Sequence, residues 1–171
     1  MPTSVLVAYA TRYGSTQEVA EAVAAALRND NLPVEVQPAR TVRSLEAYSA
    51  VVLGAPLYMF RWHADALRFL SKHRQALTAR PVAIFALGPF HNDEKERQDA
   101  RGQLIKELAK FGWLVPTALE VFGGKFDPAR LDFPYSLIGP LKKMPASDVR
   151  NWKAIEAWAH SLTAGLQPKS L

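Results

Sequence analysis

The chain has 171 residues, a formal net charge of +5 and a hydrophobic fraction of 49%. This length and composition predict one globular domain and exclude an extensively disordered chain. Cysteine is absent, which excludes disulfides, thiolate metal sites and a cysteine nucleophile. The excess of basic residues favours anionic partners without identifying one.

Targeting and binding patterns narrow the expected location and partners. The chain enters an apolar strand almost at once, without the basic segment, apolar run and cleavage site of a signal peptide. No apolar run approaches the roughly 20 residues of a membrane span, so we expect a cytoplasmic protein. No nucleic-acid partner is expected, because zinc-finger spacing, aromatic RNA-binding signatures and basic runs are missing. The histidines are scattered without paired spacing, so no metal site is expected.

A strand, a loop and a helix open the chain. Residues 4–10 are typical of a short buried strand, and an amphipathic helix begins at Ser15 or Thr16 and ends near Asn29. The first turn of a helix has unpartnered N–H groups and partial positive charge, and Gly14 allows an anion to approach closely. The loop therefore predicts a phosphate site, although a plain capped connection between strand and helix has the same pattern.

The remaining elements alternate between strand and helix. Four more strands are predicted at 33–37, 50–53, 81–87 and 116–122, with helices at about 64–73, 94–111 and 147–166. The last helix is predicted to begin at a cap formed by Ser147 or Asp148. An irregular insertion, interrupted by prolines, is expected at about 125–147 within a single domain spanning 1–171.

This alternation predicts an α/β fold in which helices cover both faces of a parallel sheet. In doubly wound sheets the ligand lies beyond the carboxyl ends of the strands, where the strand order changes direction. Three loops meet that requirement, at residues 11–16, 55–63 and 88–94. We expect them to converge on one ligand.

The second and third of these loops are rich in flat side chains, namely Tyr58, Phe60, Trp62, Phe90 and His91. A planar ring with a phosphate tail would use both kinds of loop, the ring by stacking and the tail through backbone N–H groups. Flavin mononucleotide (FMN) fits this description. The alternative is that these aromatic residues belong to the core or to a lid.

Five short motifs are distinctive: YATRYGST at 9–16, GAPLY at 54–58, WH at 62–63, FGGK at 122–125 and NWKAI at 151–155. Together they resemble the flavodoxin superfamily, and more narrowly the branch of flavodoxin-type, menaquinone-dependent protoporphyrinogen IX dehydrogenases. The resemblance implies a flavodoxin-like doubly wound sandwich with a five-stranded parallel sheet in the order 2-1-3-4-5. It also implies non-covalent FMN.

Carried onto this sequence, the resemblance implies three groups of FMN contacts. The phosphate is assigned to Thr11, Arg12, Tyr13, Gly14, Ser15 and Thr16, one side of the ring to Pro56, Leu57, Tyr58, Met59 and Phe60, and the other side to Gly88, Pro89 and Phe90. The chain departs from electron-carrier flavodoxins in two respects. Those proteins usually have threonine at the position of Tyr13, and they are acidic whereas this chain is basic.

The expected function is that of an FMN-dependent oxidoreductase that moves electrons between an organic substrate, such as a protoporphyrinogen-like compound, and a quinone or other acceptor. The alternatives are an electron-transfer or regulatory binding module without its own substrate, and a flavodoxin fold that has lost its flavin. No catalytic residue or oligomeric state is predicted, although His63 and His91 are candidates for proton movement or for simple packing.

A peripheral membrane contact is a further expectation. Lys142 and Lys143 lie beside the apolar residues Leu137, Ile138 and Leu141, a combination that suits a membrane edge. The alternative is a solvated surface over a small satellite core.

Overall fold

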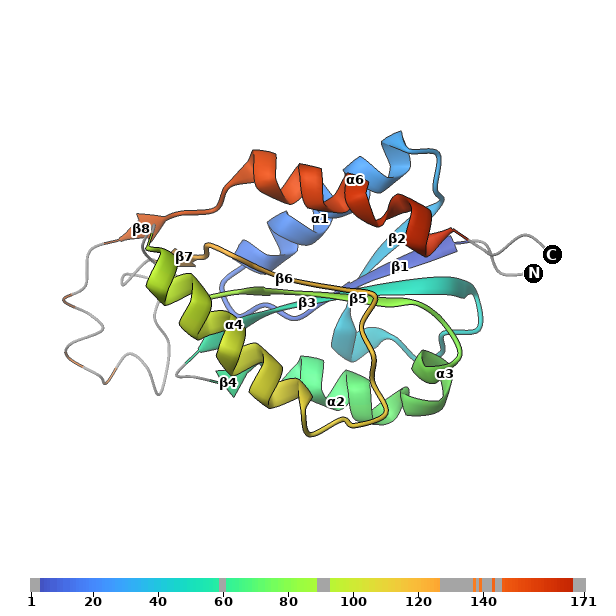
Figure 1. Ribbon diagram of the computed structural model, residues 1–171, viewed down its shortest axis with the longest axis horizontal. Helices are drawn as coiled ribbons and strands as arrows, with labels where there is room; N and C mark the ends of the chain where they lie inside the picture. Colours follow the sequence, from blue (N-terminus) through green and yellow to red (C-terminus); the bar gives the residue numbers. More distant parts are fainter. Residues whose placement is uncertain are drawn as a thin grey trace.

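The computed structural model describes residues 4–58, 61–88, 93–126, 137, 139, 143 and 146–167. A central sheet lies between two helical layers (Figure 1). Its parallel strands are β1 (Ser4–Tyr9), β2 (Val34–Pro38), β3 (Tyr48–Tyr58), β5 (Val82–Leu87) and β6 (Ala118–Phe122). They lie in the order β2-β1-β3-β5-β6, which is 2-1-3-4-5 when the parallel strands are counted alone. The predicted doubly wound α/β sandwich is confirmed.

One short strand was not predicted. β4 (Arg61–Trp62) pairs antiparallel with the end of β3, where Leu57 lies opposite Trp62 and Tyr58 opposite Arg61. Residues 55–58 continue β3 and residues 61–62 form β4, so most of the segment 55–63 is strand rather than one long loop. The prediction of a continuous loop there is wrong, because its backbone groups pair across β3 and β4.

The helices divide between the two faces of the sheet (Figure 1). α1 (Ser15–Asn29) and α6 (Trp152–Leu166) cover one face. α2 (Ala64–Lys72), α3 (Arg74–Thr78) and α4 (Glu94–Leu108) cover the other, and a single 3₁₀ turn, η1 (Ala39–Thr41), follows β2. Among the described residues no helix is both long and apolar enough to span a membrane.

Each face of the sheet has its own hydrophobic core. Along β1, Val5 and Val7 join the core under α1 and α6, whereas Leu6 and Ala8 join the core under α2 and α4. Successive side chains of a strand point to opposite faces, so a continuously apolar strand fills both cores. This two-sided burial holds the carboxyl ends of the strands at fixed positions.

The predicted start of the last helix is wrong. Ser147 and Asp148 form β8, which pairs with β7 (Lys125–Phe126), and α6 begins only at Trp152. The cap is Asn151, whose side chain accepts a hydrogen bond of 3.0 Å from the N–H of Ala154. The N–H of Val149 instead donates to the carbonyl of Gly124, so the two ends of the insertion are joined by strand pairing before the helix starts.

Smaller differences concern the helices of the other layer. α4 ends at Leu108, three residues before the predicted Phe111, and Ile105 is 51% exposed although it was predicted to face the core. Leu104 and Leu108, one turn apart, form the buried stripe and leave Ile105 to one side. The short helix α3 was not predicted. The remainder of the insertion at 127–145 lies largely outside the described residues.

Candidate functional site

The first loop changes chain direction at Gly14. This residue has a φ of 91° immediately before α1, in the left-handed region that glycine adopts without a steric penalty. The side chain of Thr11 fixes the turn, because its Oγ1 accepts a hydrogen bond of 2.9 Å from the N–H of Gly14. The loop therefore brings the start of α1 to the carboxyl end of β1.

Thr16 is the most informative residue of this loop. It lies in the first turn of α1 and is fully buried, yet its Oγ1 has no hydrogen-bond partner among the described residues. Buried hydroxyls are normally satisfied, and an unsatisfied one costs about 1–3 kcal/mol. The backbone N–H groups of a helix's first turn also lack partners within the helix. Hydroxyl and amides together form a cluster of donors suited to a phosphate.

Tyr13 joins the first loop to the end of β3. Its ring meets that of Tyr58 edge to face, with centroids 6.1 Å apart. Its hydroxyl accepts a hydrogen bond of 3.1 Å from Nε of Arg12, and the guanidinium carbon of Arg12 lies 5.8 Å from the Tyr13 ring centroid. Tyr13 is therefore an aromatic contact between the first loop and the end of β3.

The third loop begins at Gly88, close to the end of β3. Its N–H donates to the carbonyl of Phe122, and a Cβ added to it would lie 3.3 Å from Cδ1 of Leu57 and 3.2 Å from Cβ of Ala100. The described parts of the three predicted loops are thus neighbours at one edge of the sheet. The other predicted ring contacts lie outside the described residues; they are Met59, Phe60, Pro89 and Phe90, and His91 is also outside.

Among the three described ring contacts at the end of β3, only Tyr58 is not buried. Pro56 and Leu57 are buried in β3, whereas Tyr58 is half-buried at the strand's end. Tyr58 therefore has surface left for a further contact, whereas the two residues before it pack within the sheet.

Trp62 corrects a sequence-based expectation. It was predicted to offer a flat surface to a ligand, but it is 2% exposed and packs in the core beneath α2 and α4. Its indole Nε1 donates a hydrogen bond of 3.0 Å to the carbonyl of Ala55. The ring of Trp62 therefore packs inward and fixes β4 against the core. The sequence spacing did not reveal this orientation, because β4 was not predicted.

A buried carboxylate supports this anchor from α4. Glu107 is 6% exposed, and its Oε2 accepts a hydrogen bond of 3.3 Å from the backbone N–H of Trp62. Burial alone would raise the pKa of Glu107, but Lys110, 2.8 Å away, and the Trp62 N–H outweigh it and hold the pKa below its usual value. Glu107 therefore stays ionised and fixes the return strand next to the second loop.

His63 has a structural role. Its Nδ1 accepts a hydrogen bond of 3.1 Å from the N–H of Asp65 and so caps α2. Burial lowers the pKa of His63 below the usual histidine value, because desolvation disfavours the charged form. A neutral ring with Nδ1 as acceptor is the form that this cap requires, so the structure favours packing over proton movement.

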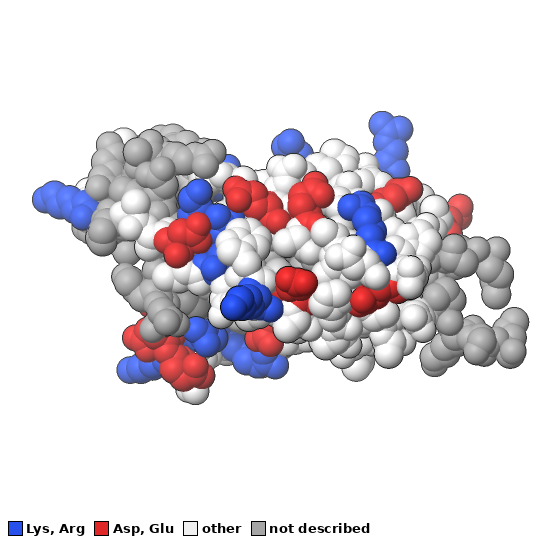
Figure 2. Space-filling model, turned by 90° about the horizontal axis from the view of Figure 1, so that it is seen from above, with Lys and Arg blue, Asp and Glu red and all other residues white. Residues whose placement is uncertain are grey.

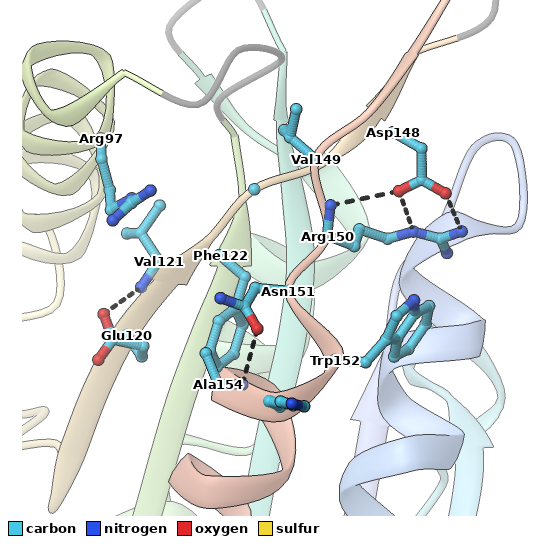
Figure 3. Close-up of a pocket in the computed structure, with 12 residues that line it drawn as sticks. Arg97, Glu120, Val121, Phe122, Asp148, Val149, Arg150, Asn151, Trp152 and Ala154 are labelled. Carbon is cyan, nitrogen blue, oxygen red and sulfur yellow. Dashed lines mark hydrogen bonds and ion pairs between the residues drawn. The ribbon is translucent and has the colours of Figure 1, made fainter.

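A cleft of about 750 Å³ lies between α4 and the start of α6 (Figure 3). Arg97, Glu120, Phe122 and Trp152 are among its lining residues. Figure 3 shows Arg150 on the side next to the first turn of α1, bound to Asp148. Sequence reasoning missed Arg150, because its contact with Glu18 joins residues 132 positions apart and no local pattern signals such a pair.

The face of the molecule that α1 and α6 cover has charges of both signs. On this face acidic and basic side chains are interspersed (Figure 2). The net charge of +5 is therefore not gathered into one basic patch here. Of the residues expected to form a membrane edge, Ile138, Leu141 and Lys142 lie outside the described residues, and Leu137 is 73% exposed.

Comparison with known families identifies a match over most of the chain. The family model described as flavodoxin domain matches residues 6–138. A curated relative, protoporphyrinogen IX dehydrogenase (quinone) from Escherichia coli strain K12, is 27% identical over 111 residues. That alignment covers 63% of this chain and 61% of the relative, so the chain spans less than two thirds of the length of the curated relative it matches.

Solved structures show the same fold. Oxidised flavodoxin 1 from Bacillus cereus has a TM-score of 0.60 at 18% identity and covers 96% of this chain and 99% of that protein. A flavodoxin from the domain Archaea has a TM-score of 0.60 at 12% identity, with coverage of 95% and 98%. Identities this low support the fold alone.

Proposed function

We propose, from the premise that this chain belongs to the flavodoxin domain family, that it binds FMN without a covalent link and works in oxidation and reduction. The family membership supports a flavin, and the geometry of the first loop supports a phosphorylated one. The proposed site lies at the carboxyl edge of the sheet, where the loops after β1, β3 and β5 are neighbours.

The observation that carries this proposal is the unpartnered hydroxyl of Thr16. It lies fully buried in the first turn of α1, next to the glycine turn. In the proposed complex, Thr11, Arg12, Tyr13, Gly14, Ser15 and Thr16 surround the phosphate. The ring would lie against the residues after β3, including Tyr58, and those after Gly88.

When bound, the flavin supplies the capacity to accept and donate electrons. The chain's own residues bind and orient it. The first loop presents hydrogen-bond donors to the phosphate, Tyr13 and Tyr58 join that loop to the end of β3 by an aromatic contact, and Trp62 with Glu107 holds β4 in place. No described residue is assigned as a general acid or base.

Our leading proposal is an enzyme that oxidises an organic substrate, protoporphyrinogen-like in character, and passes the electrons to a quinone or another acceptor. The named activity of the E. coli relative supports it. The basic net charge suits an anionic substrate better than the acidic surface of small electron carriers does. A carrier without its own substrate is the second candidate, favoured by the likeness to flavodoxins.

The cofactor proposal is tested by Thr16→Val, which removes the hydroxyl and keeps the shape. We expect FMN affinity, measured by quenching of flavin fluorescence, to fall at least about tenfold, because a hydrogen bond to a charged group is worth roughly 1.5–3 kcal/mol.

The matched control for that variant is Thr117→Val. The hydroxyl of Thr117 already donates to the carbonyl of Val82, at the amino end of β5 and away from the site. This variant is expected to keep wild-type FMN affinity. If Thr16→Val binds FMN as tightly as the wild-type protein, the proposed phosphate site is wrong.

The choice between enzyme and carrier requires turnover measurements on FMN-loaded protein. Oxidation of protoporphyrinogen at a rate that depends on both protein and added quinone would support the enzyme. If the protein is reduced by a flavodoxin reductase but does not accelerate that oxidation, the carrier is supported and the substrate proposal fails.

A further inference from the structure

Arg150 lies in the chain between β8 and α6, at the base of the insertion, yet it contacts the first turn of α1. Its Nη1 is 3.2 Å from Oε2 of Glu18 and 3.4 Å from the carbonyl oxygen of Ser15. Figure 3 shows its side chain reaching toward the start of that helix. Only 4% of the Arg150 side chain is exposed, whereas 56% of the Glu18 side chain is, so the guanidinium is shielded from water but its ion pair with Glu18 lies at the surface.

The guanidinium is held on three sides. Nε and Nη2 donate to the two oxygens of Asp148 at 2.9 and 2.8 Å, and the guanidinium carbon lies 4.7 Å from the ring centroid of Trp152. The paired carboxylate keeps the pKa of Arg150 above its usual value. A bidentate carboxylate pair fixes the plane of the guanidinium, which leaves Nη1 directed at α1.

The charges around this contact matter for an anionic ligand. Glu18 is the acidic residue in the first turn of α1, the turn that offers its N–H groups to a phosphate. A carboxylate at that position repels a phosphate unless a cation offsets it. Arg150 supplies that cation and, through the carbonyl of Ser15, also holds the backbone of the same turn.

We propose that Arg150 is a positioning residue for the first loop and sets its selectivity for phosphorylated over unphosphorylated flavin. It acts through Ser15 and Glu18 rather than by touching the ligand, holding the turn in its donor geometry and offsetting the charge of Glu18. This inference rests on the proposed function, because it assumes that the first loop takes the phosphate of FMN.

The test compares FMN with riboflavin, which has the same ring system but no phosphate. Apoprotein of the wild type and of Arg150→Gln is titrated with each flavin by fluorescence quenching. We expect the ratio of the riboflavin Kd to the FMN Kd to fall by about fivefold in Arg150→Gln, the scale of the repulsion between a phosphate and one nearby carboxylate that is exposed to water and no longer offset. Riboflavin affinity itself should change little.

Arg150→Lys tests whether charge and geometry both matter. A lysine keeps the positive charge but cannot pair with Asp148 through two parallel bonds while reaching α1. We expect its Kd ratio to lie between those of the wild type and Arg150→Gln. A ratio no higher than that of Arg150→Gln would overturn the charge part of the proposal.

Arg80→Gln is the matched control. Arg80 is also partly buried, and its Nη1 donates to the carbonyls of Leu45 and Tyr48, on the opposite edge of the sheet. Loss of that arginine is expected to lower stability without changing the Kd ratio. If Arg80→Gln lowers the ratio as much as Arg150→Gln, the effect is one of general stability and the proposal is wrong.

Glu18→Gln provides an independent check on the pairing. The substitution should raise the Kd ratio more in the Arg150→Gln background than in the wild type. In that background no guanidinium offsets the charge of the Glu18 carboxylate, so its removal matters more. Equal effects in both backgrounds would overturn the role assigned to Glu18.

The failures of the two proposals can be told apart. A wild-type protein that binds FMN no better than riboflavin contradicts the phosphate site and, with it, this inference. A wild-type protein that prefers FMN, together with an unchanged ratio in Arg150→Gln, contradicts the role of Arg150 alone.

Discussion

The two ends of α1 are both tied to the segment that forms and precedes α6, but in different ways. At the start, Arg150 reaches Glu18 and Ser15, while the hydroxyl of Thr16 remains without a partner among the described residues. At the far end, Asp30 accepts hydrogen bonds from Thr163 at 2.6 Å and pairs with His160 at 2.7 Å. The start of α1 therefore has a buried hydroxyl without a partner, whereas the polar groups at its far end are hydrogen-bonded to α6.

This difference indicates that the start of α1 serves ligand binding, whereas its far end serves stability. The far end joins two helices through a satisfied cluster, so its contribution is to hold α6 on α1. At the start of α1, Arg150 holds the turn that contains the unsatisfied donors, and its guanidinium stays charged at any ordinary pH. Unsatisfied polar groups lower stability and are retained where a ligand can satisfy them.

The largest expected effect is at Gly14, where a side chain would disrupt the turn before α1. Gly14→Val places a β-branched residue at a φ of 91°, which costs about 1–2 kcal/mol in strain or displaces the loop. We expect FMN affinity to fall by about a hundredfold or more, since several donors move together. Fluorescence titration with FMN measures this loss.

Gly102→Ala is the control for that substitution. Gly102 lies within α4, and an added Cβ would meet nothing within 4 Å. Alanine should raise the free energy of unfolding by roughly 0.5–1 kcal/mol and leave FMN affinity unchanged. Weaker FMN binding in Gly102→Ala would show that a substitution far from the first loop also lowers FMN affinity. That result would contradict the assignment of FMN binding to the start of α1.

The next largest effect is expected when threonine is replaced by valine near each end of α1. Thr16→Val should raise the free energy of unfolding of the apoprotein by about 1 kcal/mol, because it removes an unsatisfied buried hydroxyl. Thr163→Val should instead lower the melting temperature, because it deprives Asp30 of a hydrogen bond. Thermal unfolding of both apoproteins measures the two shifts. Shifts of the same sign would contradict the distinction between the ends.

The smallest expected effect is a pH dependence at the far end. The hydrogen bond to Asp30 raises the pKa of His160, and the bonds from Thr163 and His160 lower the pKa of Asp30. The His160 contribution is complete below the unfolded pKa of about 6.5 and is lost as the pH rises through the higher folded value. The Asp30 contribution is present above an unfolded pKa of about 3.9 and is lost as the pH falls through its lower folded value.

The stability gap between wild type and His160→Gln should therefore be widest near pH 5–6, between these two limits, and should shrink toward alkaline pH. Urea unfolding of both proteins across this range measures it. A gap that widens as the pH rises would show that the protonated histidine is not what joins the helices.

Much of the fold could be predicted from local patterns. Continuously apolar segments such as 82–87 identified the central strands, and the spacing of Val19, Val23 and Leu27 identified the buried face of α1. The strand order depended on the family resemblance, since periodicity does not determine which strands are neighbours. The first loop was found because its chemistry is contiguous in sequence.

The rest depended on contacts that no local pattern encodes. Trp62 was predicted to face a ligand, but the unpredicted pairing of β4 with β3 turns it into the core. Asn151, rather than Ser147 or Asp148, caps α6 because strand pairing uses the earlier residues. Arg150 reaches the first turn of α1 only because the fold brings the base of the insertion beside that helix.

The most direct test of the central claim is the visible absorption spectrum of the purified protein after FMN is added and unbound ligand is removed by desalting, with the released ligand identified by mass. A flavin spectrum that remains with the protein, and a released mass equal to that of FMN, is the predicted result. A colourless protein that leaves all of the FMN in the wash would contradict the proposal that the start of α1 and its neighbouring loops form an FMN site.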